Sequence, residues 1–190
     1  MARTISLPYP SLGAAYTNTG VSDDSQPAAG NLNDNGYSLS AQALAIAPGA
    51  TVSHGGLDFT WPAGAPDNVV AAGQTIELGG SGTKLGLIGT AVNATASGPA
   101  TITYTDGTTQ TYPLSFADWY ADKAAGGGEI LTTVAYHNSP TGQVNHQVSL
   151  YYTAVALDPV KTVRYLTLPT ISQSTEGAQI KMHIFSASIG

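Results

Sequence analysis

Short segments that alternate apolar with polar residues, separated by Gly, Pro, Asn and Asp, are the feature that most restricts the fold of this chain. Nine segments have this period of two and are rich in β-branched and aromatic residues: 50–61, 68–78, 83–92, 100–105, 109–116, 130–137, 146–157, 161–168 and 179–189. Successive side chains of a β-strand point to opposite faces, so the pattern predicts strands. We therefore predict an all-β fold, an antiparallel, jelly-roll-like β-sandwich.

The 190 residues are enough for one domain with a substantial core, so we expect a single domain over residues 1–190. Residues 1–15 could form an extended N-terminal segment. Helix is expected only in the segment 40–49, as one or two short turns. Ser40 is a typical N-cap there, and Pro48 with Gly49 would end the helix.

One hairpin can be predicted in detail, over residues 100–116. Its apolar residues all have even numbers, so they share one face only if the numbers of paired residues add to an even value. A two-residue turn at Asp106 and Gly107 would pair residues whose numbers add to an odd value, so the apolar residues would lie on different faces. A three-residue loop, in which Gly107 is left-handed, pairs Tyr104 with Thr108 and Ala100 with Tyr112. The pattern therefore predicts the three-residue loop.

Charged residues are scarce: they make up 9% of the chain, and the net charge is -6. About a quarter of the residues are charged in an average domain, so neutral polar side chains must form most of this surface, which suits an uncharged ligand. With 6 Lys and Arg in total, the chain lacks the clustered cations that bind nucleic acid or an anionic membrane. Cysteine is absent, which excludes disulfides and thiol chemistry. No long apolar run and no signal-peptide pattern are present.

Catalytic motifs are incomplete. The segment GGSGTKLG at 79–86 lacks the spacing of a phosphate-binding loop, and Thr83 two residues after Ser81 excludes a nucleophile elbow. The three glutamates are far apart, whereas a glycosidase needs two facing carboxyl groups. The four histidines show no zinc-site spacing. We therefore expect a protein that is not an enzyme.

Acidic and amide side chains concentrate in residues 20–44. They are Asp23, Asp24, Asn31, Asn33, Asp34 and Asn35. The asparagines and Gly36 copy the spacing of an EF-hand, but these ligands are neutral and Gln42 replaces the closing glutamate. Asx-turns that bend the chain before a helical turn are the preferred interpretation. A calcium site formed by Asp23, Asp24 and backbone carbonyls is the alternative.

Two aromatic clusters are the candidates for ligand binding. The alternation of the preceding strand breaks at Asp118, and Trp119 and Tyr120 follow as the chain enters a glycine-rich loop. Sugars stack a C–H face on aromatic rings, while polar side chains bind their hydroxyls, so we expect Asp118, Trp119 and Tyr120 to contact a ligand. Tyr136, His137 and Asn138 form a second cluster of this kind, in which Tyr136 and Asn138 are the expected ligand-binding residues. For Trp119, packing over an open end of the sandwich is the alternative.

Several elements, in this order, resemble a known family. They are YTNTGVSDDS, GYSLSAQAL, LDFTWP, APDNVVAAGQTI, GSGTKLGLIG, YTDGTTQTYPLSFADW and HIFSASIG. Over nearly the whole chain they resemble the β-sandwich module appended to many secreted bacterial, especially actinobacterial, glycoside hydrolases. The resemblance implies a secreted, non-catalytic accessory domain and supplies no site residues. Residues 120–147 depart from the pattern.

Two functions from different classes follow. The first is a carbohydrate-binding accessory module that stacks its aromatic rings on a neutral polysaccharide or oligosaccharide and is covalently linked to a catalytic domain. The second is a structural module that docks on another domain or self-assembles without binding sugar. An enzyme ranks third. Neither function involves nucleic acid or a membrane, and calcium is the only cofactor considered.

Overall fold

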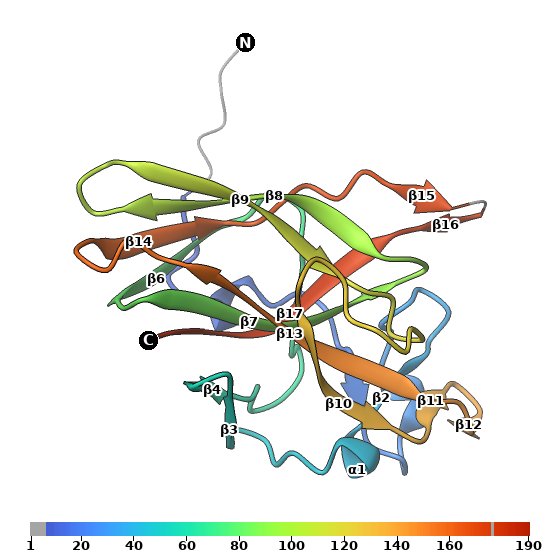
Figure 1. The fold of residues 1–190 in the computed structure, drawn as a ribbon. Coiled ribbons are helices and arrows are strands. Elements are labelled where there is room, and N and C mark those ends of the chain that lie inside the picture. Colours follow the sequence, from blue (N-terminus) through green and yellow to red (C-terminus); the bar gives the residue numbers. More distant parts are fainter. Residues whose placement is uncertain (1–6, 176) are drawn as a thin grey trace.

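The computed structural model describes residues 7–175 and 177–190, which form three layers of β-structure (Figure 1). The four strands of one outer sheet are, in spatial order, β6 (Thr75–Ser81), β14 (Thr162–Thr167), β8 (Ala96–Tyr104) and β9 (Thr109–Phe116). The five strands of the central sheet are β10 (Glu129–Val134), β13 (Val148–Ala156), β7 (Lys84–Val92), β17 (Lys181–Ile189) and β5 (Val69–Val70). All pairings in both sheets are antiparallel, so the predicted all-β sandwich is confirmed.

Shorter elements make up the third layer. They are β1 (Val21–Ser22), β2 (Ser38–Ser40), β11 (His137–Ser139) and β12 (Gly142–Val144), which share one sheet, the hairpin of β3 (Thr51–His54) and β4 (Leu57–Thr60), and the helix α1 (Ala41–Leu44). Two 3₁₀ turns, η1 (Gly13–Ala15) and η2 (Pro27–Ala29), and the hairpin of β15 (Ser174–Thr175) and β16 (Ala178–Gln179) complete the described structure. No helix in these residues has the length and hydropathy needed to cross a membrane.

The central sheet is buried on both faces. Along β7, Leu85 and Leu87 belong to the core between the central sheet and the outer sheet of β6, β14, β8 and β9. Ile88 and Val92 belong to the core between the central sheet and the third layer. A sheet that is covered on both faces needs apolar residues at consecutive positions. This explains why the segment 84–92 is almost entirely buried.

The hairpin of β8 and β9 has the predicted register. Ala100 pairs with Tyr112, and the N–H of Tyr104 donates to the carbonyl of Thr108 at 2.9 Å. Gly107 has a φ of 84°, as the left-handed position of a three-residue loop requires. The predicted three-residue loop is therefore confirmed.

The predicted helix forms, but it is shorter than its sequence pattern allowed. The hydroxyl of Ser40 accepts the N–H of Ala43 at 3.0 Å and caps α1. The helix then ends at Leu44 because Ala45 is left-handed, with a φ of 52°. The prediction that Pro48 and Gly49 end the helix was therefore wrong.

The N-terminal segment is tied to the sandwich. Residues 1–6 of the proposed extended segment lie outside the described residues. Tyr9 forms a bridge with Ile76 of β6, and the turn η1 follows at Gly13–Ala15. The described part of this segment is therefore only partly extended.

Candidate functional site

A tight turn after β9 places Trp119 and Tyr120 side by side. The carboxylate of Asp118 accepts the N–H of Tyr120 at 2.9 Å, and the carbonyl of Asp118 accepts the N–H of Ala121 at 2.8 Å. Consecutive side chains of an extended chain would point apart. Because the chain turns here, the two rings are stacked, with centroids 5.1 Å apart and planes 8° apart.

The two stacked rings differ in exposure. Trp119 is 2% exposed and belongs to the core of the third layer, whereas Tyr120 is 46% exposed. The backbone of Trp119 also bonds to Ala91 and Ser149, which fixes it between β7 and β13. The expectation that the indole of Trp119 touches a ligand is therefore corrected: this indole supports Tyr120 from within the core.

His137 of β11 holds the hydroxyl of Tyr120. Its Nδ1 lies 3.2 Å from the carbonyl of His146, so Nδ1 carries the proton and Nε2 accepts the hydroxyl of Tyr120 at 3.1 Å. Burial lowers the pKa of His137, which favours this neutral form, and burial also raises the pKa of the Tyr120 phenol. The exposed ring of His146 lies 4.3 Å from that of Tyr120. Tyr120 is therefore a fixed, partly exposed ring.

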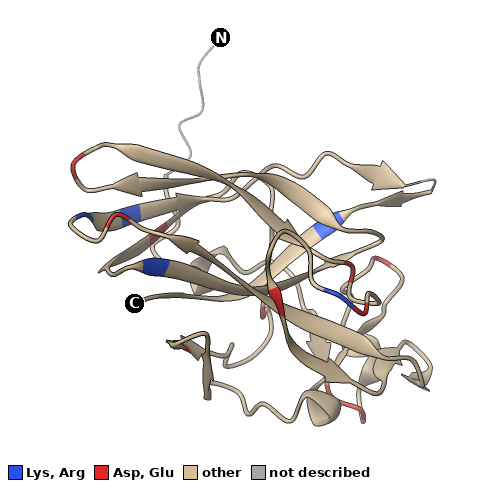
Figure 2. Cartoon of the chain, viewed as in Figure 1, with Lys and Arg blue, Asp and Glu red and all other residues tan. Residues whose placement is uncertain are grey.

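A pocket of about 230 Å³ adjoins Tyr120. It is lined by Tyr120, Ala121, Asp122, Ile130, Thr133, Gln147 and Ser149. The hydroxyl groups of Thr133 and Ser149 lie 2.8 Å apart and bond to each other, and Ile130 is 38% exposed. Charged residues are sparse over the whole chain (Figure 2). We refer to the pocket with Tyr120 and His146 as the Tyr120 site.

Tyr136 and Asn138, the second predicted cluster, do not join this site. They flank His137 along the chain, and successive residues of an extended chain point to opposite sides. The hydroxyl of Tyr136 donates to Asp24 at 2.7 Å, and the amide of Asn138 donates to the same carboxylate at 3.0 Å. Asn138 is 1% exposed, so its prediction as a ligand-binding residue is corrected to a buried structural role.

The carboxylates of Asp23 and Asp24 are bound by protein donors. Asp23 accepts the N–H and hydroxyl of Ser25 and the amide of Gln42, and Asp24 also accepts the hydroxyl of Ser40 at 2.5 Å. Burial alone would raise the pKa of Asp24, but its hydrogen bonds from Ser40, Tyr136 and Asn138 lower it overall. The hydrogen bonds from Ser25 and Gln42 lower the pKa of Asp23.

This arrangement bears on the calcium alternative. In the described part of the chain, no three or more His, Cys, Asp or Glu side chains gather in one place. Asn33 accepts the N–H groups of Asn35 and Tyr37, and Asn31 accepts that of Gly36. These hydrogen bonds confirm the Asx-turns and the helical turn predicted for residues 20–44. The calcium site at Asp23 and Asp24 stays a prediction.

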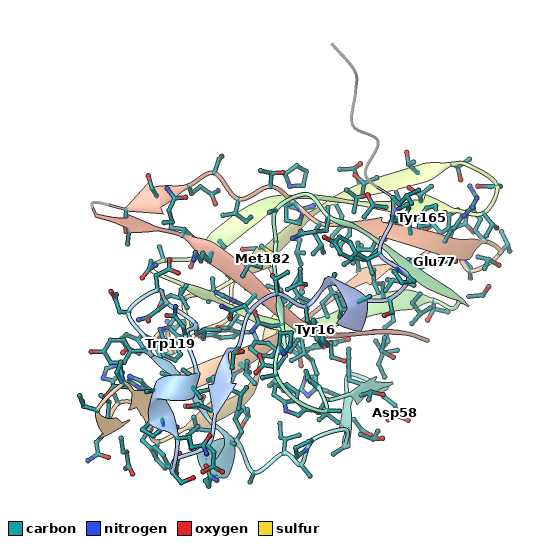
Figure 3. The ribbon with its side chains drawn as sticks, turned by 180° about the vertical axis from the view of Figure 1, so that it is seen from behind. Tyr16, Asp58, Glu77, Trp119, Tyr165 and Met182 are labelled. Atoms are coloured by element: carbon teal, nitrogen blue, oxygen red, sulfur yellow. The ribbon has the colours of Figure 1, made fainter. Side chains whose placement is uncertain are left out.

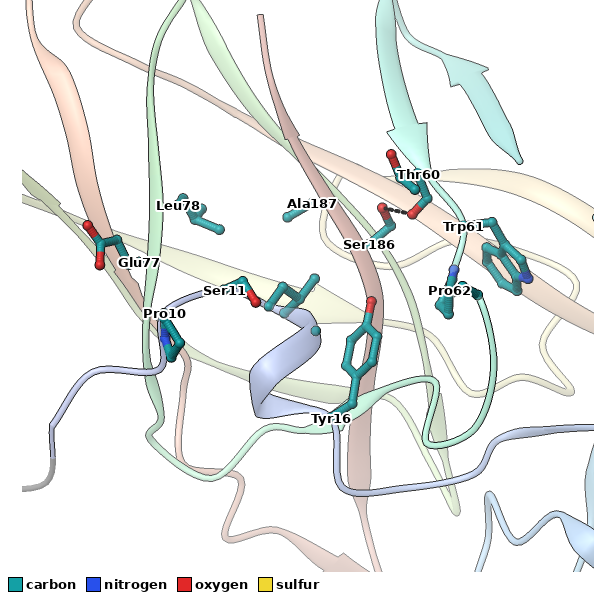
Figure 4. A pocket seen from close by; sticks show the side chains of 13 residues that line it. Pro10, Ser11, Tyr16, Thr60, Trp61, Pro62, Glu77, Leu78, Ser186 and Ala187 are labelled. Atoms are coloured by element: carbon teal, nitrogen blue, oxygen red, sulfur yellow. Dashed lines mark hydrogen bonds between the residues drawn. The ribbon is translucent and has the colours of Figure 1, made fainter. Parts of the chain in front are cut away.

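A larger, more open pocket of about 420 Å³ lies on the side of β6 and β17 (Figure 4). Its aromatic residues already contact other parts of the protein: Trp61 is 4% exposed, and the hydroxyl of Tyr16 donates to the carbonyl of Phe185. Ser186 donates to the carbonyl of Thr60 at 2.8 Å. The pocket therefore offers little free aromatic surface, and we take the Tyr120 site as the better candidate.

Sequence reasoning found Tyr120 but missed its partners. The sequence pattern places His137 with Tyr136 and Asn138 and assigns no role to His146, because no metal spacing relates the histidines. The break in alternation at Asp118 and the departure of residues 120–147 from the family-like pattern are the signals that point to this region. The site draws Ile130, Thr133 and Gln147 from that same segment.

Comparisons with known proteins agree with the fold. A search of curated proteins gives no match. The model of a family described as the AziU2-like beta-sandwich domain matches residues 8–173, which include every strand of the two large sheets except β17. Because this match covers most of the sequence, the chain belongs to the AziU2-like beta-sandwich domain family.

Proposed function

We propose that this chain is a non-catalytic carbohydrate-binding module that packs a neutral glycan against the ring of Tyr120. The observation that carries the proposal is the exposure of a tyrosine ring that the protein holds rigidly. Tyr120 is 46% exposed, yet Trp119 stacks beneath it and His137 binds its hydroxyl. A ring that is already fixed loses little conformational freedom when a ligand binds.

The surroundings of Tyr120 suit a neutral, hydroxyl-rich ligand. Thr133, Gln147 and Ser149 provide uncharged donors and acceptors, and Asp122 provides one carboxylate. Ile130 adds an apolar wall. An apolar surface with a few polar groups is the usual composition of a small-molecule site. Since the pocket is small, we expect it to take one or two sugar units.

A glycan array tests this proposal with four proteins. Wild type and Tyr120→Phe should bind the same glycan, because both keep the ring, whereas Tyr120→Ala should bind about tenfold more weakly or not at all. Tyr165→Ala is the matched control, because Tyr165 is a partly exposed tyrosine on β14, at the opposite end of the molecule from Trp119 (Figure 3). This control should bind like wild type.

The array also decides between the two functions. Each variant is first checked by circular dichroism and thermal melting, so that loss of binding is not confused with loss of fold. If folded wild type binds no glycan, or if Tyr120→Ala binds as well as wild type, the proposal fails. A folded protein that binds no glycan would favour the docking or self-assembly module.

We propose further that the module belongs to a secreted bacterial glycoside hydrolase. The support for this context is the resemblance of its sequence elements to modules of such enzymes. The mass of the native polypeptide recovered from culture medium tests it. A larger polypeptide with a hydrolase domain supports the proposal, and a free chain of 190 residues would contradict it.

A further inference from the structure

Another pocket, of about 260 Å³, lies where three separate sequence elements meet. Val21 to Asp23 come from the first element, Ala41 from the capped helix, and Asp67 from the Pro-Asp-Asn segment. It shares no lining residue with the pocket beside Tyr120. We refer to it as the Asp67 pocket.

The carboxylate of Asp67 is fixed and almost fully buried, with 5% exposure. Its Oδ1 accepts the N–H of Gly20 at 2.8 Å and the amide of Asn68 at 2.8 Å. Asn68 is in turn held by the Nδ1–H of the buried His183, at 2.8 Å. The carboxylate therefore keeps one orientation.

The second oxygen of Asp67 accepts one hydrogen bond from another residue, the N–H of Val21 at 3.0 Å. All the hydrogen bonds of this carboxylate come from neutral donors. Within residues 7–175 and 177–190, no Lys, Arg or His forms an ion pair with Asp67. The negative charge is thus buried without a protein cation, and burial raises the pKa of Asp67.

The walls of the Asp67 pocket are mostly apolar. They include Ile46, Pro48, Trp61 and Pro62. The one other carboxylate among the lining residues is that of Asp23, which is exposed. A pocket of this composition repels anions and favours a ligand that combines a hydrocarbon body with one positive charge.

We propose that the Asp67 pocket binds a small apolar amine in its ammonium form. The ammonium group bonds to Oδ2 of Asp67, and the hydrocarbon body packs against the accessible side chains of Ile46 and Pro48. Binding compensates a charge that the protein leaves unpaired, which is why a cation is favoured over a neutral molecule of the same shape.

The test compares cyclohexylamine with cyclohexanol, two molecules of similar shape that differ in charge. Each is titrated into the full chain at pH 7 and followed by the shifts of backbone amide NMR signals. We expect saturable shifts at Val21 and Asp67, with binding of the amine about tenfold tighter than binding of the alcohol. Shifts of Tyr120 should be absent.

Two variants complete the test. Asp67→Asn should bind the amine and the alcohol with similar affinity, because the charge is gone. Gly64→Leu should weaken both, since Gly64 lines the pocket and a Cβ there meets no atom within 4 Å, so the larger side chain fits the fold. If Asp67→Asn does not fold, the amine and alcohol comparison on wild type and Gly64→Leu still decides.

Three results would overturn the proposal. They are equal affinities of wild type for the amine and the alcohol, shifts that do not saturate, and shifts that stay unchanged in Gly64→Leu. Failure here leaves glycan binding at Tyr120 unaffected, because the two sites share no lining residue.

Discussion

Replacing Trp119 by alanine should destabilise the fold severely. A tryptophan that is 2% exposed removes up to about 250 Å² from water, which at about 25 cal/mol per Å² gives an upper bound of about 6 kcal/mol. Measured Trp→Ala changes in cores cost about 3–5 kcal/mol. We therefore expect Trp119→Ala to lower the free energy of unfolding by about 4 kcal/mol, a large part of the stability of an ordinary domain.

Tyr120→Ala should cost about half as much, because about half of this side chain is already exposed to water. It also removes the ring stack with Trp119 and the hydrogen bond to His137. Tyr120→Phe keeps the ring and removes only the hydroxyl, so it should cost about 1 kcal/mol. The order Trp119→Ala, Tyr120→Ala, Tyr120→Phe follows directly from the exposure of the two rings.

Equilibrium unfolding in urea measures all three variants, provided that the slope of the transition is unchanged. If Trp119→Ala cost no more than Tyr120→Ala, the indole would not lie in the core and the account of the stacked pair would be wrong. The result also determines which variant is suitable for the glycan array. Trp119→Ala would lose binding by unfolding, so Tyr120 is the residue whose replacement reports on recognition.

Four further predictions concern titratable side chains, close packing and metal removal. Burial lowers the pKa of His183 to about 3 from 6.5, so between these values the unfolded chain binds a proton that the folded chain does not. The free energy of unfolding, measured in urea, should therefore fall by up to about 1.4 kcal/mol for each pH unit below pH 6.5. His183→Leu should reduce this pH dependence, and an unchanged pH dependence in that variant would contradict the role of His183. The pKa of Asp24 is lowered from 3.8 on folding, so Asp24 stabilises the fold above that pH and this contribution is lost as pH falls further. Asp24→Asn should lower the urea midpoint at pH 7 and differ less from wild type near about pH 3; an equal difference at both values would argue against this role. Gly89→Ala should cost about 1–3 kcal/mol in the same assay, because its Cβ would lie 2.5 Å from the carbonyl of His183, whereas Gly64→Ala, with no atom within 4 Å, should stay near wild type. EDTA should leave the melting temperature unchanged if protein donors alone hold Asp23 and Asp24; a fall of several degrees would restore the calcium alternative.

The strands of the two large sheets could be predicted because their signals are local. Alternation marks the strands of the outer sheet, and apolar residues at consecutive positions mark β7 of the central sheet. The parity of apolar positions sets the register between Ala100 and Tyr112 without knowledge of the rest of the fold. The third layer could not be predicted in the same way. Its strands β1 and β2 have 2 and 3 residues, and one partner of β2, the strand β11, lies far along the chain. Strands this short have no readable period.

The sequence pattern could predict Tyr120 as a residue of the candidate site, but it could not predict the geometry of that site. The break in alternation at Asp118 correctly marked a turn. The pattern could not predict which of the two rings, Trp119 or Tyr120, would stay exposed to solvent. The third layer that buries Trp119 is built from distant segments such as β2 and β11. Likewise, nothing local relates Asp67 to the N–H groups of Gly20 and Val21.

The buried hydrogen bonds of Asp24 and the partly exposed ring of Tyr120 lie on opposite sides of β11. On one side of β11, Asn138 bonds to Asp24, which also holds Ser40 at the end of β2. On the other side, His137 binds the hydroxyl of Tyr120. Strands of two or three residues are too short to be stable by backbone pairing alone, so these side-chain hydrogen bonds must position β11. Asp24 and Tyr120 are therefore attached to opposite sides of the same short strand, each through a side-chain hydrogen bond.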